Sequence, residues 1–221
     1  MYFDPRPKTK KEDLFNRENE LVQFQKALSY SAIILVTGLR RTGKTSFVDV
    51  ALSETDHPHI FLDMRDLPVI PSRVQILRKI ETAFTKLSKK WTQLLNALKN
   101  VKGVNIAGSS ITFQWGKEGV DLTELFDKID TWAKNHNKHF LIAFDEAQLI
   151  RGDKNTPKLL ARIADVNRNI ITILTGSEIG LLYDFLRFDN PESPLYGRHY
   201  VEIKMRNFKK EETKAFLQAG F

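Results

Sequence analysis

The sequence predicts a three-layer α/β/α fold, in which a parallel β-sheet lies between two layers of helices. Short apolar runs alternate with segments of helical periodicity, which is the pattern of parallel strands connected by helices. A glycine-containing loop joins the first apolar run to a helix. The densest apolar run, residues 140–144, ends in Asp145-Glu146, and so apolar a strand is typical of a sheet covered on both faces.

Strands and helices are expected in alternation along the chain. Five strands are expected at residues 32–37, 59–63, 139–145, 169–175 and 200–203. Asn16 is the candidate N-cap of a first helix, because apolar residues recur at helical spacing after it. Further helical segments are expected at residues 46–53, 72–98, 121–135, 157–167, 180–188 and 209–218. Alternating apolar residues around Gly108-Ser109, up to Trp115, predict a β-hairpin insertion at about residues 101–116.

The composition excludes several kinds of site. The 221 residues include no cysteine, so disulfides, thiolate zinc sites and cysteine nucleophiles are excluded. No apolar run reaches the roughly 18 residues that a membrane-spanning helix needs, and the first residues show no signal-peptide pattern. We therefore expect a cytoplasmic protein without a membrane partner.

The chain carries a formal net charge of +7, and basic residues gather near both ends. These residues are Arg6, Lys8, Lys10, Lys11, Arg17, Lys204, Arg206, Lys209, Lys210 and Lys214. Two interpretations are open: a face that binds nucleic-acid phosphates, or a solvated surface with acids between the cations.

Residues 38–45 fit the pattern G-x-x-x-x-G-K-[ST], the phosphate-binding loop of the P-loop nucleoside triphosphatases. In such a loop, backbone N–H groups and the positive end of the following helix face the phosphates. Lys44 is expected to reach the β- and γ-phosphates, and the Thr45 hydroxyl to bind Mg²⁺. The residues expected to bind nucleotide are Gly38, Leu39, Arg40, Arg41, Thr42, Gly43, Lys44, Thr45 and Ser46.

The acidic pair Asp145-Glu146 stands where open α/β sheets place their chemistry, beyond the carboxyl end of a strand. Asp145 is expected to hold Mg²⁺, usually through water, and Glu146 to act as general base toward the attacking water. The alternative is a strand that simply ends in a charged turn, which the phosphate loop about 100 residues earlier disfavours.

A glutamate directly after this aspartate is typical of the additional-strand ATPases, whereas P-loop kinases and Ras-type GTPases generally lack it. In that class an extra strand lies between the loop strand and the acidic strand, and residues 170–175 are the candidate. Thr175 and Ser177 at its end are candidates to hydrogen-bond the attacking water or the γ-phosphate, and we favour Ser177. The alternative is an ordinary turn of small residues.

Four segments together resemble the archaeal ATPase family, on the AAA+/STAND side of the P-loop NTPases and related to replication-initiator ATPases. They are Phe15-x-Arg17-Glu18-x-Glu20-Leu21, GLRRTGKTS at residues 38–46, FDEAQ at residues 144–148 and Ser193-Pro194-Leu195-Tyr196-Gly197-Arg198. The inserted hairpin resembles that family too. The resemblance implies the strand order 5-1-4-3-2. It also favours ATP over GTP, together with the absence of an Asn-Lys-x-Asp motif.

The resemblance implies further site residues. Phe15, Asn16 and Arg17 would lie nearest the adenine, although Phe15 has the alternative of ordinary core packing. Arg198 resembles a family arginine that acts as an arginine finger or phosphate sensor; its alternative role is to structure a proline-containing loop. Family members usually continue into a helical lid and a winged-helix domain, whereas this sequence stops at residues 216–221, where the lid should begin. Either the chain is a fragment or the lid is absent. Residues 1–221 are therefore expected to form the ATPase core, and neither a sensor-2 arginine nor a winged helix is assigned.

The expected function is Mg²⁺-dependent binding of ATP or ADP and hydrolysis of ATP. The catalytic set is Glu146, Lys44, Arg198 and Ser177, with Thr45 and Asp145 as metal ligands. One alternative is a nucleotide-gated switch or scaffold with negligible intrinsic hydrolysis; another is a small-molecule kinase, which the Asp-Glu pair disfavours. Candidate partners are DNA, a second copy of the chain and another protein. DNA binding is expected to be weak and without sequence preference, because phosphate contacts carry no base information.

Overall fold

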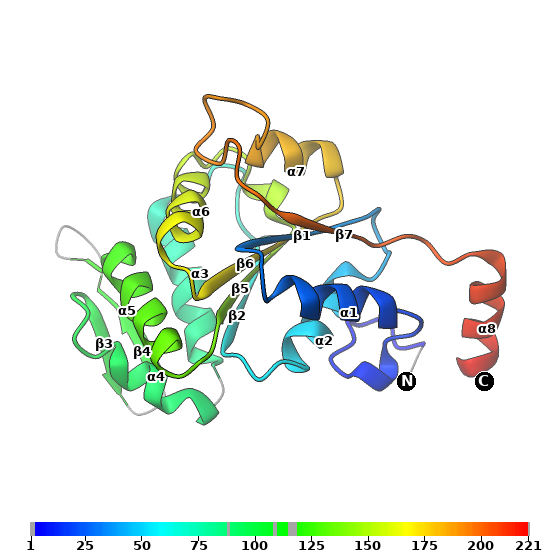
Figure 1. Ribbon diagram of the computed structural model, residues 1–221, viewed down its shortest axis with the longest axis horizontal. Coiled ribbons are helices and arrows are strands. Elements are labelled where there is room, and N and C mark those ends of the chain that lie inside the picture. The colour runs from blue at the N-terminus through cyan, green and yellow to red at the C-terminus, as the bar shows by residue number, and fades with distance from the viewer. Residues whose placement is uncertain (1–2, 88, 108–109, 115–118, 221) are drawn as a thin grey trace.

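The computed structural model describes residues 3–87, 89–107, 110–114 and 119–220, and its centre is a five-stranded parallel sheet (Figure 1). The strands are β1 (Ile33–Thr37), β2 (His59–Asp63), β5 (Phe140–Asp145), β6 (Ile170–Gly176) and β7 (Val201–Lys204). Their order across the sheet is β2-β5-β6-β1-β7, and each neighbouring pair is parallel. The expected order is confirmed, and β6 is the additional strand between β1 and β5.

Helices cover both faces of the sheet, because alternate strand residues point to opposite sides. Ile34 and Val36 of β1 pack with α1 (Glu18–Ala27) and α2 (Lys44–Ser53). Ile33 and Leu35 belong to the core on the other face. The helices of that face are α3 (Arg73–Thr85), α5 (Leu122–Asn135), α6 (Asn155–Val166) and α7 (Ile179–Leu186). The three-layer prediction is therefore confirmed.

Two expected helices differ in the structure. The first begins at Glu18 with Arg17 as its N-cap, because Asn16 has a φ of 52° and so lies outside the helical region. The segment expected at residues 72–98 is divided into α3 and α4 (Thr92–Ala97), with a short 3-10 turn at Lys89–Trp91. The two parts pack on different partners, since α3 lies against β2 whereas α4 lies against α5. No helix in the described ranges is long and apolar enough to cross a membrane.

The inserted hairpin is confirmed where the structure describes it. β3 (Val104–Ala107) and β4 (Ser110–Phe113) form an antiparallel pair, in which Ile106 lies opposite Ile111. Ile111 and Phe113 are buried, and Phe113 packs against Phe84 of α3 at a ring-centroid distance of 6.4 Å. The insertion is thereby joined to the main core. The turn Gly108-Ser109 and Trp115 lie outside the described residues.

The last helix, α8 (Lys210–Gly220), stands apart from the sheet at the opposite end of the molecule from the hairpin (Figure 1). None of its residues is buried. It is attached through Phe216, whose ring lies 5.5 Å from Phe3, 5.4 Å from Phe15 and 5.9 Å from Phe208. This aromatic cluster joins α8 to the segment that precedes α1.

Three histidines lie near the amino ends of β2 and β5. The rings of His57 and His139 are 5.3 Å apart, and the backbone N–H of His139 donates to His57 Nδ1 at 3.2 Å. His59 Nδ1 lies 3.3 Å from the carbonyl oxygen of His57. Burial lowers the pKa of all three side chains, against smaller opposing effects of nearby acids such as Asp49 and Asp130.

We expect the free energy of unfolding to decrease as the pH falls below about 6.5, the ordinary histidine value. In that range the unfolded chain binds more protons than the folded chain, so acid favours unfolding, whereas the contribution is constant at higher pH. Urea denaturation between pH 8 and 5.5 measures how the free energy of unfolding depends on pH, and His139→Gln should make this dependence weaker. A stability that rises on acidification would contradict this account.

Candidate functional site

The phosphate loop connects β1 to α2 and depends on two glycines. Gly43, the N-cap of α2, has a φ of 87°, which residues with a side chain rarely adopt. Gly38 leaves no room for a side chain, because a Cβ there would lie 2.3 Å from the carbonyl oxygen of Met205. The loop is therefore held against the chain that leaves β7.

Lys44 is only 4% exposed, although it carries the charge expected to meet the phosphates. Its Nζ donates to the carbonyl oxygens of Gly38 at 2.9 Å and Leu39 at 2.8 Å. Burial lowers the pKa of Lys44, while Glu146 and Asp145 oppose the shift. The ammonium group is thus already placed inside the loop, opposite both acids.

The other phosphate-loop residues make contacts that shape the loop. Arg40 forms an ion pair with Glu178 at 2.9 Å, which links the loop to the turn after β6. Arg41 has a φ of 65°, and the Thr42 hydroxyl donates to the Leu39 carbonyl at 2.9 Å. Ser46 Oγ accepts the backbone N–H of Lys8 at 3.0 Å.

A continuous chain of hydrogen bonds joins the phosphate loop to both acids. Thr45 Oγ1 donates to Asp145 Oδ2 at 3.0 Å, and Thr175 Oγ1 donates to Asp145 Oδ1 at 2.7 Å. Thr175 Oγ1 also accepts the backbone N–H of Glu146 at 2.9 Å. Burial raises the pKa of Asp145, and the two hydroxyl donors oppose that shift.

The Glu146 carboxylate is held by the turn that follows β6. Its Oε2 accepts the Ser177 hydroxyl at 2.7 Å, the Ser177 backbone N–H at 3.1 Å and Gln148 Nε2 at 2.6 Å. Burial alone would raise the pKa of Glu146, but these donors outweigh it and the net pKa lies below the ordinary value. Glu146 is therefore held as a carboxylate.

Thr45 and Asp145 together present the hard oxygen ligands that suit Mg²⁺. Mg²⁺ usually keeps several waters and uses one or two protein oxygens beside phosphate, which matches a hydroxyl and a carboxylate 3.0 Å apart. Within the described ranges, no group of three or more histidine or acidic side chains could hold a metal ion by itself. The residues present thus fit a metal that is shared with a nucleotide.

Arg17 contacts the phosphate loop, whereas Phe15 and Asn16 lie at a cavity beside α8. Phe15 and Asn16 line a cavity of about 620 Å³ between the N-terminal segment and α8. The ring of Phe15 lies 5.7 Å from that of Phe208. Arg17 is 4% exposed, and its guanidinium is hydrogen-bonded to other parts of the protein. The adenine assignment of these three residues stays a prediction.

Arg17 joins three parts of the chain. Its Nη1 pairs with Glu20 at 3.0 Å, and its Nη2 donates to the carbonyl oxygens of Thr42 at 3.3 Å and Arg206 at 2.8 Å. The guanidinium also lies 4.7 Å from the ring centre of Phe208. The phosphate loop, α1 and the linker to α8 therefore share one buried cation.

Arg198 lies at the other end of the sheet. It pairs with Asp165 at 2.6 Å and donates to the Pro194 carbonyl, and it precedes β7 by three residues. Because β7 is parallel to β1, Arg198 is at the amino end of the sheet, whereas the phosphate loop follows the carboxyl end. The structure thus brings Lys44, Thr45, Asp145, Glu146 and Ser177 together and leaves Arg198 apart.

Several basic residues near the chain ends have acidic partners. Arg6 pairs with Asp4, Lys11 with Glu54, Lys204 with Glu202 and Arg206 with Glu212. These pairs reduce the positive charge that the two ends could offer to a polyanion, and they agree with the solvated-surface interpretation.

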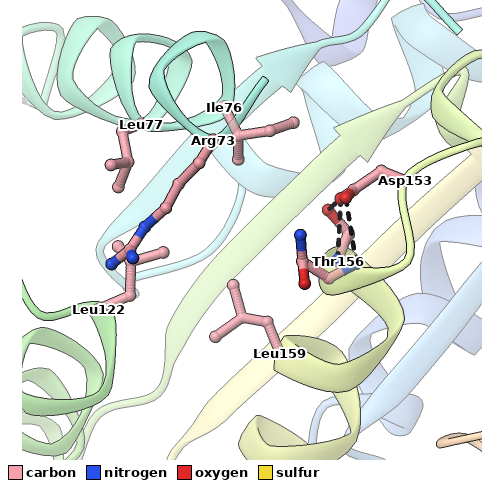
Figure 2. Close-up of a pocket in the computed structure, with 8 residues that line it drawn as sticks. Arg73, Ile76, Leu77, Leu122, Asp153, Thr156 and Leu159 are labelled. Carbon is pink, nitrogen blue, oxygen red and sulfur yellow. Dashed lines mark hydrogen bonds between the residues drawn. The ribbon is translucent and has the colours of Figure 1, made fainter. Parts of the chain in front are cut away.

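A separate cavity of about 310 Å³ lies between α3, α5 and α6 (Figure 2). Its apolar wall consists of Ile76, Leu77, Leu122 and Leu159. The Arg73 side chain extends across the cavity toward Leu122. Asp153 accepts hydrogen bonds from the backbone N–H and the hydroxyl of Thr156 at the start of α6 (Figure 2). None of the expected site residues lines this cavity, so it is distinct from the nucleotide site.

Sequence reasoning assigned no role to Gln148, although the structure places it against the expected general base. The signal that could have found it is a polar residue within the otherwise apolar stretch Ala147–Ile150, two positions after Glu146. Arg65, just beyond β2, was missed too; it pairs with Asp63 at 2.7 Å and places positive charge near Asp145 and Glu146.

Residues 14–221 match the family described as an ATPase domain predominantly from Archaea, and the chain belongs to this family. The Walker-type ATPase PABY2304 of Pyrococcus abyssi is similar over the full chain, with 31% identity and a TM-score of 0.81. No significant match was found among curated protein sequences.

Structures of ORC proteins share the fold at lower identity. The Drosophila ORC bound to DNA has 18% identity and a TM-score of 0.62 over 92% of this chain. The Aeropyrum pernix ORC2 protein, in ADPNP-ADP complexes, has 12% identity and a TM-score of 0.58 over 99%. This chain spans 62% of the Pyrococcus protein, 46% of the Drosophila chain and 54% of the Aeropyrum chain. The AAA+-like fold and the resemblance to the archaeal ATPases are thereby confirmed.

We expect Arg17→Met to lower the free energy of unfolding by about 3–5 kcal/mol, because it leaves the partly buried carboxylate of Glu20 without its cation. The carbonyls of Thr42 and Arg206 also lose their donor. Urea denaturation measures the loss. Arg17→Lys keeps the charge but not the planar fork of donors, so its free energy of unfolding should lie between those of the unaltered chain and Arg17→Met. A loss below about 1 kcal/mol would show that the buried pair contributes no more than a surface pair.

Proposed function

We propose that this chain binds ATP together with Mg²⁺ and hydrolyses the bond between the β- and γ-phosphates. The hydrogen-bonded chain Thr45–Asp145–Thr175–Glu146 supports the proposal, because it joins the start of α2 to the two acids at the end of β5 through a hydroxyl group of β6. Family membership supports ATP as the nucleotide.

The residues of this chain divide the chemistry among them. The loop N–H groups and Lys44 bind the phosphates, and Lys44 balances charge that develops on the γ-phosphate oxygens. Mg²⁺, when bound through Thr45 and Asp145, supplies further positive charge there. Glu146 takes a proton from water as the water oxygen attacks phosphorus in line, and Ser177 fixes the Glu146 side chain.

The partners of the site are also proposals. Arg198 lies at the amino end of the sheet, so an arginine-finger role would act on the nucleotide of a neighbouring copy rather than on its own. DNA remains a candidate partner on account of the net charge of +7, with phosphate contacts only. A cytoplasmic location remains a prediction of the sequence.

We expect Lys44→Ala to weaken ATP binding by about 2–5 kcal/mol, because a buried phosphate charge loses its partner. Titration with a fluorescent ATP analogue measures the affinity, and circular dichroism checks that the variant is folded. Lys26→Ala, which removes an exposed cation of α1 outside the phosphate loop, is the matched control and should have a much smaller effect. A folded Lys44→Ala protein with unchanged affinity would exclude residues 38–45 as the phosphate site.

Glu146→Gln is expected to keep ATP binding and to lower turnover about 10²-fold or more, because the amide cannot accept the proton. Multiple-turnover hydrolysis, with and without DNA, is the measurement. Equal rates for the variant and the unaltered chain would show that Glu146 is not the base. Tight ATP binding without turnover under either condition would favour the nucleotide-gated switch.

A further inference from the structure

Gln148 is buried beside the proposed general base and makes an asymmetric set of contacts. Gln148 is 1% exposed and lies in the 3-10 turn η3 (Ala147–Ile150), which follows β5. Nε2 donates to Glu146 Oε2 at 2.6 Å, whereas Oε1 is buried and accepts no hydrogen bond from a described residue. A carboxylate can only accept, so the amide must present its NH₂ group to Glu146.

Packing alone does not account for an amide at this position. An apolar side chain of the same length would fill the space without leaving a buried oxygen unsatisfied, which is costly. The favourable contact is therefore the hydrogen bond from Nε2 to Glu146, which is made although Oε1 is left without a donor. Gly176 leaves the room that the amide needs, because a Cβ there would lie 3.0 Å from Gln148 Oε1 and 2.9 Å from Leu182 Cδ2.

All donors to the Glu146 side chain meet the same oxygen. Ser177 contributes its hydroxyl and its backbone N–H, and Gln148 contributes Nε2, to Oε2 alone. Within the part of the chain that the structure describes, no protein group donates to Oε1 of Glu146. Two fixed elements, η3 and the turn after β6, thus anchor one side of the carboxylate and leave the other side available.

We propose that Gln148 is a positioning residue that, with Ser177, fixes Oε2 of Glu146 so that Oε1 is the oxygen that receives the proton from water. The proposal rests on the proposed hydrolysis. In that step the proton moves from water to Oε1, and the water oxygen bonds to the γ-phosphorus. The bond from phosphorus to the bridging oxygen breaks, leaving ADP and phosphate. Gln148 takes no proton. It orients the Glu146 carboxylate, which does.

The experiment replaces Gln148 by methionine, which has a similar shape and no N–H donor. We expect the kcat of Gln148→Met to fall about 10-fold, less than for Glu146→Gln, while the affinity for ATP stays within about twofold. The pKa of Glu146 should rise, because one donor to its charged form is lost. Carbon-13 NMR of labelled glutamate carboxyl carbons follows that pKa, with the Glu146 signal assigned by its absence in Glu146→Gln.

Two further variants sharpen the comparison. Ser177→Ala removes a second donor to the same oxygen and should raise the pKa of Glu146 in the same direction. Gln23→Met makes the same chemical change on the exposed face of α1 and should alter neither kcat nor this pKa. Circular dichroism and urea denaturation confirm that each variant is folded.

Three outcomes would overturn the proposal. An unchanged kcat with an unchanged Glu146 pKa would show that Gln148 only packs. A higher kcat would show that the amide restrains Glu146 rather than directing it. Equal losses in ATP affinity and kcat would indicate a general distortion of the site. Absence of turnover in the unaltered chain would instead contradict the proposed function, and the NMR titration would still decide whether Gln148 fixes the carboxylate.

Discussion

The hydroxyl group of Thr175 is the contact on which the geometry of both acids depends. It donates to Asp145 and accepts the backbone N–H of Glu146, so one buried side chain on β6 contacts both acids at the end of β5. Glu146 has a φ of 55°, an uncommon conformation for a residue with a long side chain, and this hydrogen bond helps to hold it. The backbone turn directs the Glu146 side chain toward Ser177. The additional strand therefore carries the groups that orient the chemistry of its neighbour.

Burying charge at this edge of the sheet is tolerated because each charged group has local compensation. Asp145 is fully buried but accepts from two hydroxyls, while Lys44 donates to two loop carbonyls. An uncompensated charge in such a place would cost several kcal/mol or lose its ionisation. The compensation also means that the polar groups are oriented before a ligand arrives. Electrostatic stabilisation of a reaction is most effective under that condition, because little reorganisation is then required.

The sheet could be predicted from the sequence because its signals are local, and the same holds for the grouping of the candidate site residues at one edge of it. The apolar runs predicted the five strands, and the phosphate-loop pattern and the acids after Phe144 predicted which residues gather at the carboxyl edge. The break between α3 and α4 was not predictable, since the apolar periodicity continues through it and only tertiary packing separates the halves. The polarity of Gln148 within an apolar stretch marks the residue, but its hydrogen bond to Glu146 was not predictable. Its contact depends on the left-handed turn after β5, and no pattern of side chains reports a backbone angle.

The buried guanidinium of Arg17 has a mechanical consequence. A single rigid, planar group is bonded to a carbonyl of the phosphate loop and to a carbonyl of the linker that leads to α8. The helix α8 buries none of its own residues and is held by the Phe216 cluster and by the ion pair between Arg206 and Glu212. The linker that carries α8 and the phosphate loop therefore share one donor group, so a movement of either carbonyl away from Arg17 would leave a buried N–H of the guanidinium unsatisfied, at a cost in free energy.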